Sequence, residues 1–224
     1  MRKQKKVLLA MLCAVLLVVS AVCGTLAYLT DTDDATNTFT VGKVDIMLDE
    51  ADVDDSTEDA ERDHGNAYHL LPGHTYDKDP TVTVVKGSEN VYVRMMVKVE
   101  GLEALKAAMP KVDFPTFYNG DLFLLQNLCV DENNALTWDK DVWLFETFHT
   151  SGDYVGCYEF RYATKVSKNA EADTVLPALF EKITVPGEVD NDQLLKLADV
   201  QIVVTAHAIQ ADGFADADAA WAKF

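Results

Sequence analysis

The alternation of side chains in residues 91–99 constrains the fold of this chain more than any other feature. Apolar side chains occupy its odd positions: Val91, Val93, Met95, Val97 and Val99. The even positions are more polar: Tyr92, Arg94, Met96 and Lys98. A period of two places the two sets on opposite faces of a sheet, so the segment predicts a half-buried β-strand.

Other segments extend this pattern along the chain. Strand-like composition recurs at 36–48, 81–85, 142–148, 154–162 and 200–209, and Pro72-Gly73 marks one of the turns between them. Helical patterns are short, at 101–109, 190–198 and 216–223; in the second, Asp190 is the expected N-cap and Gln193 its reciprocal partner. Many short strands with few helices predict a mainly β fold, a β-sandwich.

The strand expected at 154–162 carries an aromatic stripe. One face holds Tyr154, Tyr158, Phe160 and Tyr162, and the other holds Cys157, Glu159 and Arg161. Aromatic residues at a period of two are typical of core or cross-strand packing rather than of a ligand platform. We therefore expect the aromatic face to be buried.

The N-terminus predicts a cleavable export signal at residues 1–27. Four basic residues precede an apolar run from Val7 to Val22, and Thr25-Leu26-Ala27 supplies small residues for cleavage between Ala27 and Tyr28. The alternative is a retained membrane anchor, since the apolar stretch could nearly span a bilayer. We expect a secreted domain at 28–224, which contacts the membrane only through the uncleaved leader.

The charge of the chain excludes several partners. The formal net charge is −18, and because the leader carries four basic and no acidic residues, the remainder carries −22. Such a surface repels nucleic acid and anionic lipid. Nine of the fifteen residues in 49–63 are acidic, which predicts a solvated loop. Adventitious Ca²⁺ could bind there, but the EF-hand pattern is missing, and we expect no cofactor.

Cys129 and Cys157 are the cysteines that lie outside the leader. Export makes a disulfide between them a candidate. Two separate reduced thiols fit the sequence equally well, because a sequence gives no Cα separation.

The segment 36–48 changes parity within its strand-like pattern. Phe39 and Val41 share one parity, whereas Val44, Ile46 and Leu48 share the other. This slip at Gly42-Lys43 predicts a one-residue bulge.

Two motifs in this region suggest a family. Gly24-Thr25-Leu26-Ala27-Tyr28-Leu29-Thr30-Asp31 is followed by Asn37-Thr38-Phe39-Thr40-Val41-Gly42-Lys43-Val44-Asp45-Ile46. Together they resemble the junction of the TasA/camelysin family, which Gram-positive bacteria export through the signal peptidase SipW. Three downstream segments resemble the family less closely: Leu71-Pro72-Gly73, Lys78-Asp79-Pro80 and Val91-Tyr92-Val93-Arg94. The ending, Ala206 to Phe214 with Ala220-Trp221, is similar to that of many relatives.

The resemblance implies a jelly-roll sandwich, secretion to the cell surface or biofilm matrix, and assembly into fibres. In such fibres the segment freed by cleavage completes a neighbour's sheet. Residues 28–48 are then the candidate donor, in which the side chains of Phe39, Val41, Val44 and Ile46 set the register and Gly42 lies between them in the candidate assembly strand. The alternative is that residues 36–48 form the first strand of their own sandwich. A monomeric adhesion or binding module on the same fold is the alternative function.

The camelysin branch of the family also raises the prospect of a secreted metallopeptidase. The five histidines are His64, His69, His74, His149 and His207. They form no H-E-x-x-H motif, which would present two zinc ligands and a general base on one helix. No Gly-x-Ser-x-Gly elbow occurs either. We therefore predict a non-enzymatic protein without catalytic or metal-binding residues.

Overall fold

The strand predicted from the alternation at 91–99 is β5, Val91–Glu100. It lies in an antiparallel sheet of order β10-β5-β7-β6, in which β10 is Gln201–Gln210, β7 is Cys157–Tyr162 and β6 is Trp143–Phe148. Val97 pairs with Val204 of β10 on one side and with Tyr158 of β7 on the other. We call this the β5 sheet.

The structure is a computed structural model that describes residues 11–12, 42–54, 62–108, 124, 127–187, 189–195 and 200–224. Gly42–Phe224 form one unit and Met1–Val41 another. The fold that follows is that of Gly42–Phe224. Across the described ranges we find no helix with the length and apolar character needed to cross a membrane.

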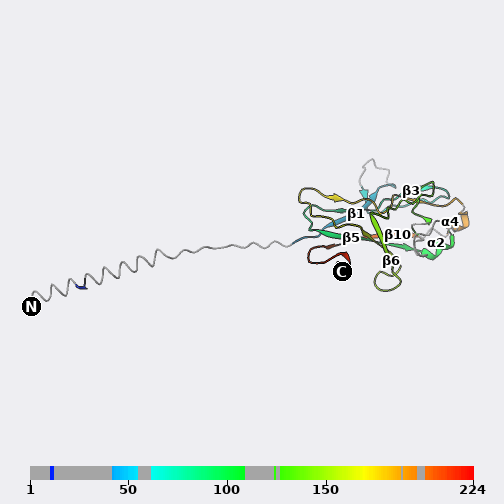
Figure 1. Cartoon of the computed structure of the whole chain (residues 1–224). Coiled ribbons are helices and arrows are strands. Elements are labelled where there is room, and N and C mark those ends of the chain that lie inside the picture. Colours follow the sequence, from blue (N-terminus) through cyan, green and yellow to red (C-terminus); the bar gives the residue numbers. More distant parts are fainter. Residues whose placement is uncertain are drawn as a thin grey trace, which may run out of the picture. The chain divides into compact units, whose positions relative to one another are not determined.

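A second sheet has the order β2-β1-β4-β8. Figure 1 labels its strand β1 and, from the first sheet, β5, β6 and β10. The strands of the second sheet are β2 (Arg62–Asp63), β1 (Ile46–Ala51), β4 (Thr81–Val84) and β8 (Thr174–Val175). All pair antiparallel, with Ile46 opposite Val84. A small sheet joins β3 (Thr75–Asp77) to β9 (Lys182–Thr184). We call the four-stranded one the β1 sheet.

The core unites residues of both four-stranded sheets. Val82 and Val84 contribute from β4, and the odd-numbered residues of β5 contribute from the β5 sheet. Tyr158 and Phe160 of β7 are almost completely buried among them. Each buried aromatic side chain removes about 150–250 Å² from water, which makes these rings a main source of stability. The predicted mainly β sandwich is confirmed.

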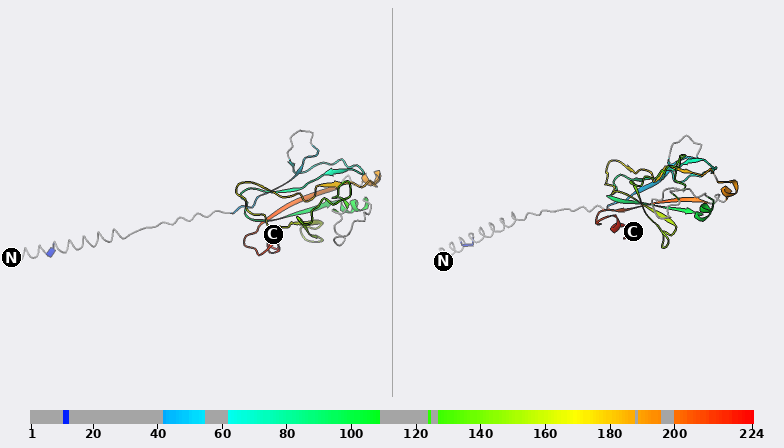
Figure 2. Two further views of the ribbon diagram at one scale, coloured as in Figure 1. Left: turned by 45° about the horizontal axis from the view of Figure 1, so that its top comes forward. Right: turned by 45° about the vertical axis from the view of Figure 1, so that its right-hand side comes forward.

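The predicted helices are present but short: α2 (Leu102–Ala108), α4 (Asn191–Leu195) and α5 (Ala217–Trp221). The predicted capping pair forms, because the Gln193 N–H donates to Asp190 Oδ1 over 2.8 Å and the Asp190 N–H donates to Gln193 Oε1 over 2.9 Å. α2 and α4 lie at one end of the unit and the C-terminal segment at the other (Figure 2).

The first strand differs from its prediction. β1 begins only at Ile46, and residues 42–45 form no strand, so the bulge predicted at Gly42-Lys43 is wrong. These residues bond instead to the connection between β4 and β5, where the Glu89 N–H donates to the Lys43 carbonyl over 2.9 Å. Residues 36–41 lie outside the described residues.

Two further predictions need correction. Tyr154 precedes β7, in a turn where Gly152 and Gly156 have positive φ, so it does not share the buried aromatic face. The acidic stretch is not simply a loop, because Asp49–Ala51 belong to β1 and Glu50 is buried. Residues 55–61 of that stretch lie outside the described residues.

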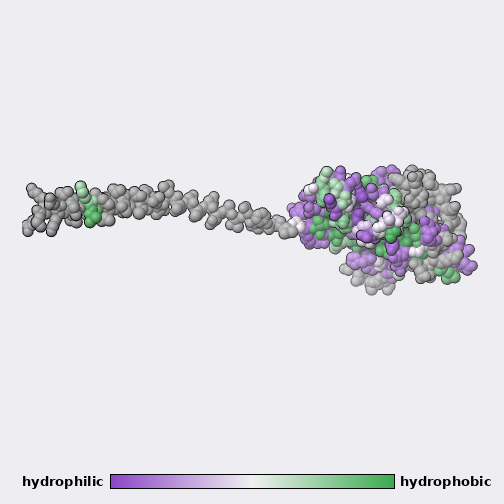
Figure 3. Space-filling model, turned by 90° about the horizontal axis from the view of Figure 1, so that it is seen from below, coloured by the Kyte–Doolittle hydropathy of each residue, from purple (hydrophilic) through white to green (hydrophobic). Residues whose placement is uncertain are grey.

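The face in Figure 3 mixes hydrophilic residues with small apolar patches.

Candidate functional site

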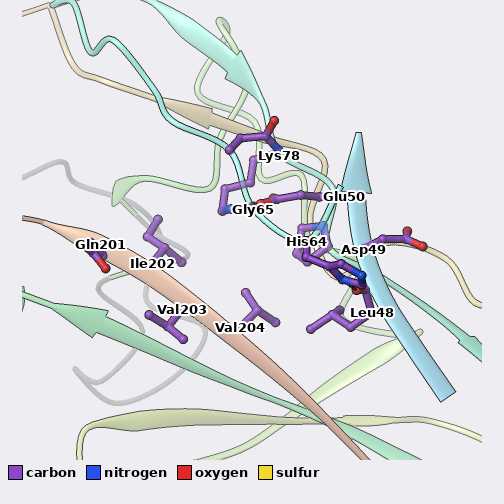
Figure 4. Close-up of a pocket in the computed structure, with 12 residues that line it drawn as sticks. Leu48, Asp49, Glu50, His64, Gly65, Lys78, Gln201, Ile202, Val203 and Val204 are labelled. Atoms are coloured by element: carbon purple, nitrogen blue, oxygen red, sulfur yellow. Dashed lines mark hydrogen bonds and ion pairs between the residues drawn. The ribbon is translucent and has the colours of Figure 1, made fainter. Parts of the chain in front are cut away.

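A groove of about 300 Å³ lies between β1 and the first half of β10. Leu48 lines it from β1, and Gln201–Val204 line it from β10 (Figure 4). β1 and β10 belong to different sheets but lie beside each other. The groove therefore lies where one edge of the sandwich leaves space between its two sheets.

The edge of β10 that faces away from β5 pairs with no other strand among the described residues. The Ala211 N–H donates to the Asn90 carbonyl, so odd-numbered residues of β10 direct their hydrogen-bonding groups toward β5. The even-numbered ones direct theirs outward: Ile202, Val204, Ala206, Ala208 and Gln210. A row of unpaired backbone N–H and C=O groups of this length is a template to which another strand can pair.

β1 presents a shorter edge beside it. The Val85 N–H donates to the Asp45 carbonyl, and the alternation of an antiparallel ladder then directs the backbone groups of Ile46 and Leu48 away from β4. His64 Nδ1 lies 2.9 Å from the Leu48 carbonyl oxygen and caps that position. The open edge of the site is therefore mainly that of β10.

A buried ion pair forms one wall of the groove. Lys78 Nζ lies 2.6 Å from Glu50 Oε2, and both side chains are less than a tenth exposed. The Tyr68 ring lies 5.4 Å from the Lys78 ammonium. Burial and the nearby Glu50 carboxylate raise the pKa of Tyr68, so its hydroxyl stays protonated. The pair joins β1 to the residues that lead into β4.

Asp79 fixes the same wall to β1 and β2. It accepts hydrogen bonds from the Ala51 N–H over 2.6 Å and from Arg62 Nη1 over 2.9 Å. Arg62 also pairs with Asp49. Burial would lower the pKa of Arg62, but the bonds to Asp79 and Asp49 outweigh it and raise the pKa. The Lys78-Asp79-Pro80 motif therefore serves to hold the groove wall in place.

A second part of the site is the junction at Gly42–Asp45, where the N-terminal segment joins the sandwich. Ser88 is almost fully buried, and its Oγ both accepts from the Asp45 N–H and donates to the Asp45 carbonyl, each over 2.9 Å. A Cβ at Gly42 would lie 2.9 Å from Glu89 Cγ, closer than contacts allow. The glycine permits this approach, and Ser88 fixes the backbone after it.

We expect Ser88→Ala to lower the free energy of unfolding by about 1–2 kcal/mol, because it leaves the part-buried Asp45 N–H without its partner. Urea denaturation measures the change. Ser151→Ala, at an exposed position, is the control and should stay within about 0.5 kcal/mol of the parent. Equal stability of the Ser88 variant and the control would show that the Ser88 bonds contribute nothing to the junction.

The structure brings together only some of the predicted assembly residues. Ala27, Tyr28, Phe39 and Val41 lie outside the described residues. Gly42 and Val44 lie at the junction, and Ile46 pairs with Val84 in β1 of its own sheet. From Ile46 onward the alternative therefore holds, in which the segment is the first strand of its own sandwich. Any donated segment has to come from the residues before it.

The two cysteines outside the leader, Cys129 and Cys157, are free, buried thiols. Cys129 lies in the core, whereas Cys157 lies on the face of β7 opposite Tyr158 and Phe160. The β5 sheet separates them, so the candidate disulfide does not form, and the alternative of two separate thiols is the one observed. Burial raises the pKa of both thiols, which makes them poor nucleophiles.

Four of the five histidines bond to four different partners. His64 and His74 each bond a backbone carbonyl, whereas His149 pairs with Glu159 and His207 with Arg94. Within the described ranges, no three His, Cys, Asp or Glu side chains are grouped so as to hold a metal ion. A catalytic zinc needs three protein ligands and an open position, so these residues do not fit one.

Sequence reasoning missed the Glu50–Lys78 pair and the open edge of β10. Glu50 lies in a stretch so acidic that it predicts a solvated loop, and its partner lies 28 residues away. The sequence did contain one signal, because Lys78 belongs to the Lys78-Asp79-Pro80 segment that resembles the family. The edge position of β10 has no sequence signal, since it depends on the order of strands in the sheet.

Part of the chain matches a known protein family. A family model described as camelysin metallo-endopeptidase matches residues 2–61, which include the junction and β1. No curated protein and no solved structure matches the chain. The matched residues exclude β10 and Lys78, so the match covers one side of the groove only.

Proposed function

The chain belongs to the TasA/camelysin family, and from this premise we propose that it is a secreted structural protein that assembles into surface or biofilm-matrix fibres by β-strand complementation. A signal peptidase would cleave between Ala27 and Tyr28. The freed segment, residues 28–41, would then pair with β10 of a neighbouring subunit. The chain would associate with other copies of itself and would have no nucleic-acid partner.

The observation that carries the proposal is the ten-residue edge of β10 beside the groove, to which no strand in the described part of the chain pairs. Five outward-facing residues offer backbone donors and acceptors, and the groove beside the first two can take side chains. Peptides that add to such an edge gain affinity from main-chain hydrogen bonds and specificity from pockets for alternate side chains. The site has both elements.

The freed segment has the length that this site requires. Residues 28–41 number fourteen and span about 46 Å when extended, whereas the ten residues of β10 span about 33 Å. Before cleavage the leader would hold the start of the segment at the membrane, so that it could not enter another subunit. Cleavage would therefore control when assembly begins.

An intramolecular arrangement is the main competitor. Lys43 and Ala211 bond to the neighbouring residues Glu89 and Asn90, so the junction lies at the Gln210 end of β10. The segment could thus return along its own β10, which would give a monomeric binding or adhesion module. The two arrangements differ in their dependence on concentration.

We propose no enzymatic activity. The family description names a metallo-endopeptidase, but four of the five histidines, His64, His74, His149 and His207, each engage a different partner in the described part of the chain. Casein hydrolysis that a chelator abolishes and Zn²⁺ restores would overturn this part of the proposal.

The test of assembly compares residues 28–224 with residues 42–224. The shorter form keeps β1 whole and removes only the proposed donor. We expect the longer form to elongate into filaments with rising concentration, measured by light scattering and electron microscopy, and the shorter form to stay monomeric. A longer form that is monomeric at all concentrations would support the intramolecular arrangement, and equal filament yield from both would exclude residues 28–41 as donor.

A further inference from the structure

The outer face of the β5 sheet carries a buried arginine. The odd-numbered residues of β5 face the core, so Arg94 points to the opposite side, yet it is only 5% exposed. Residues 216–224, which we call the C-terminal clasp, cover it together with Tyr154. Ala220 and Trp221 of α5 are themselves buried there. The clasp therefore closes over a charge rather than over an apolar patch.

Three aromatic rings lie close to the Arg94 guanidinium. Its Cζ lies 4.5 Å from the centre of the Trp221 ring, 4.7 Å from that of Phe224 and 5.1 Å from that of Tyr154. Cation–π contacts of this kind strengthen when the site excludes water. Two of the three rings belong to the clasp, so its position depends on Arg94.

Charged groups on the neighbouring strand complete the site. Arg94 Nη1 lies 3.6 Å from Glu159 Oε1, and Glu159 also bonds His149 and Arg161, each over 2.8 Å. Arg161 continues to Asp218 of the clasp over 2.6 Å, with Glu146 3.7 Å away. Burial would raise the pKa of Glu159, but the bonds from Arg161 and His149 outweigh it and lower the pKa. Glu159 thus stays ionised in mildly acidic solution.

His207 of β10 has a role beside Arg94 that requires it to be neutral. The Arg94 Nε–H donates to His207 Nδ1 over 3.2 Å, so that nitrogen must carry a lone pair. The imidazole also packs on Phe224 at 4.8 Å and on Tyr154 at 5.6 Å. Protonation would place an N–H against the Arg94 N–H and a second positive charge beside the guanidinium.

We propose that the C-terminal clasp is a pH-sensitive latch, held closed by neutral His207 and released when His207 is protonated. A second observation indicates that the closed state is not optimal: the buried Trp221 Nε1 has no hydrogen-bond partner among the residues that the structure describes. A buried donor without an acceptor favours opening, because water would satisfy it. Release would expose Arg94 and Glu159 at the C-terminal end of the unit.

The direction of the pH effect follows from the geometry. Burial first, and then the Arg94 charge, lower the pKa of His207 below its usual 6.5, while Glu159 opposes them. The closed clasp therefore binds fewer protons than the open one. Its stability is complete above about pH 6.5 and falls as the pH drops below that value, by up to about tenfold in the closing equilibrium per pH unit for one proton.

Hydrogen exchange tests the latch in residues 28–224, which contain both sheets and the clasp. We expect amides of residues 216–224, corrected for intrinsic rates, to lose protection by up to about tenfold per pH unit between about pH 6.5 and 5.5. His207→Gln keeps an acceptor for Arg94 but does not titrate, so it should abolish this response. His74→Gln, at an exposed turn, is the control and should keep it.

Either of two results would overturn the proposal. One is equal protection of the parent at both pH values. The other is an unchanged pH response in His207→Gln, which would assign the response to another group. The expected result is a His207→Gln clasp that keeps the same protection at both pH values, because glutamine supplies the acceptor for Arg94 and does not titrate.

Discussion

Lys78→Met is expected to lower the free energy of unfolding of residues 28–224 by about 3–5 kcal/mol. The reason is that Glu50 would keep its burial but lose its cation, since Lys78 Nζ at 2.6 Å is its ion-pair partner. Desolvating an ionised carboxylate without a partner costs several kcal/mol. Domains of this kind have a total stability of about 5–15 kcal/mol, so the loss would be a large fraction of it. Urea denaturation with linear extrapolation measures the change.

Two controls separate burial from charge. Lys168→Met breaks the pair with Glu89, which is equally short at 2.7 Å but much more exposed, and should cost no more than about 1 kcal/mol. The double variant Glu50→Leu with Lys78→Met removes both charges and should recover most of the loss. If Lys78→Met costs no more than Lys168→Met, the ion pair does not hold the groove wall.

The features that the sequence predicted correctly are those with local causes. The alternation at Val91–Val99 specifies β5, and Asp190 with Gln193 specifies the start of α4, because in both cases the interacting groups lie within a few residues. The β-sandwich follows from the number of such segments. These predictions needed no knowledge of which strand lies next to which.

The predictions that failed depend on contacts distant in sequence. Ile46 begins β1 because residues 43–45 are bonded to Ser88 and Glu89, more than 40 positions later. Tyr154 leaves the aromatic face of β7 because Gly156 turns the chain before the strand begins, and its ring packs on Arg94 instead. Local periodicity carries no information about such partners.

The candidate site divides in the same way. The junction at Gly42–Asp45 could be located from its motif, although not its anchoring to Ser88. The groove could not be located, because its two walls are β1 and β10, which lie at opposite ends of the unit's sequence. An acceptor edge arises only from the topology of the two sheets. The proposed donor segment, by contrast, can be located from the sequence alone, because it lies between the predicted cleavage site and the junction motif.

Ala206→Pro in β10 is expected to stop filament growth while leaving the subunit folded. Ala206 is an even-numbered residue, so its N–H points outward and takes no part in the ladder with β5. Proline is tolerated in edge strands at such positions. In an assembled fibre it would remove one hydrogen bond to the added strand and place its ring in that strand's path. We expect the critical concentration for growth to rise at least tenfold, or about 1.4 kcal/mol per added subunit.

Val175→Pro is the matched control, on the edge of the other sheet. The Leu176 N–H donates to the Val82 carbonyl, so the Val175 N–H points away from β4 just as that of Ala206 points away from β5. Both substitutions remove one outward-facing donor from an edge strand, but only Ala206 lies on the strand that borders the groove. Assembly on β10 requires that the control polymerise as the parent does, with both variants showing native circular dichroism. Filaments of Ala206→Pro at the parent's critical concentration would exclude this edge as the acceptor, because an added strand could not pair past the proline ring unchanged.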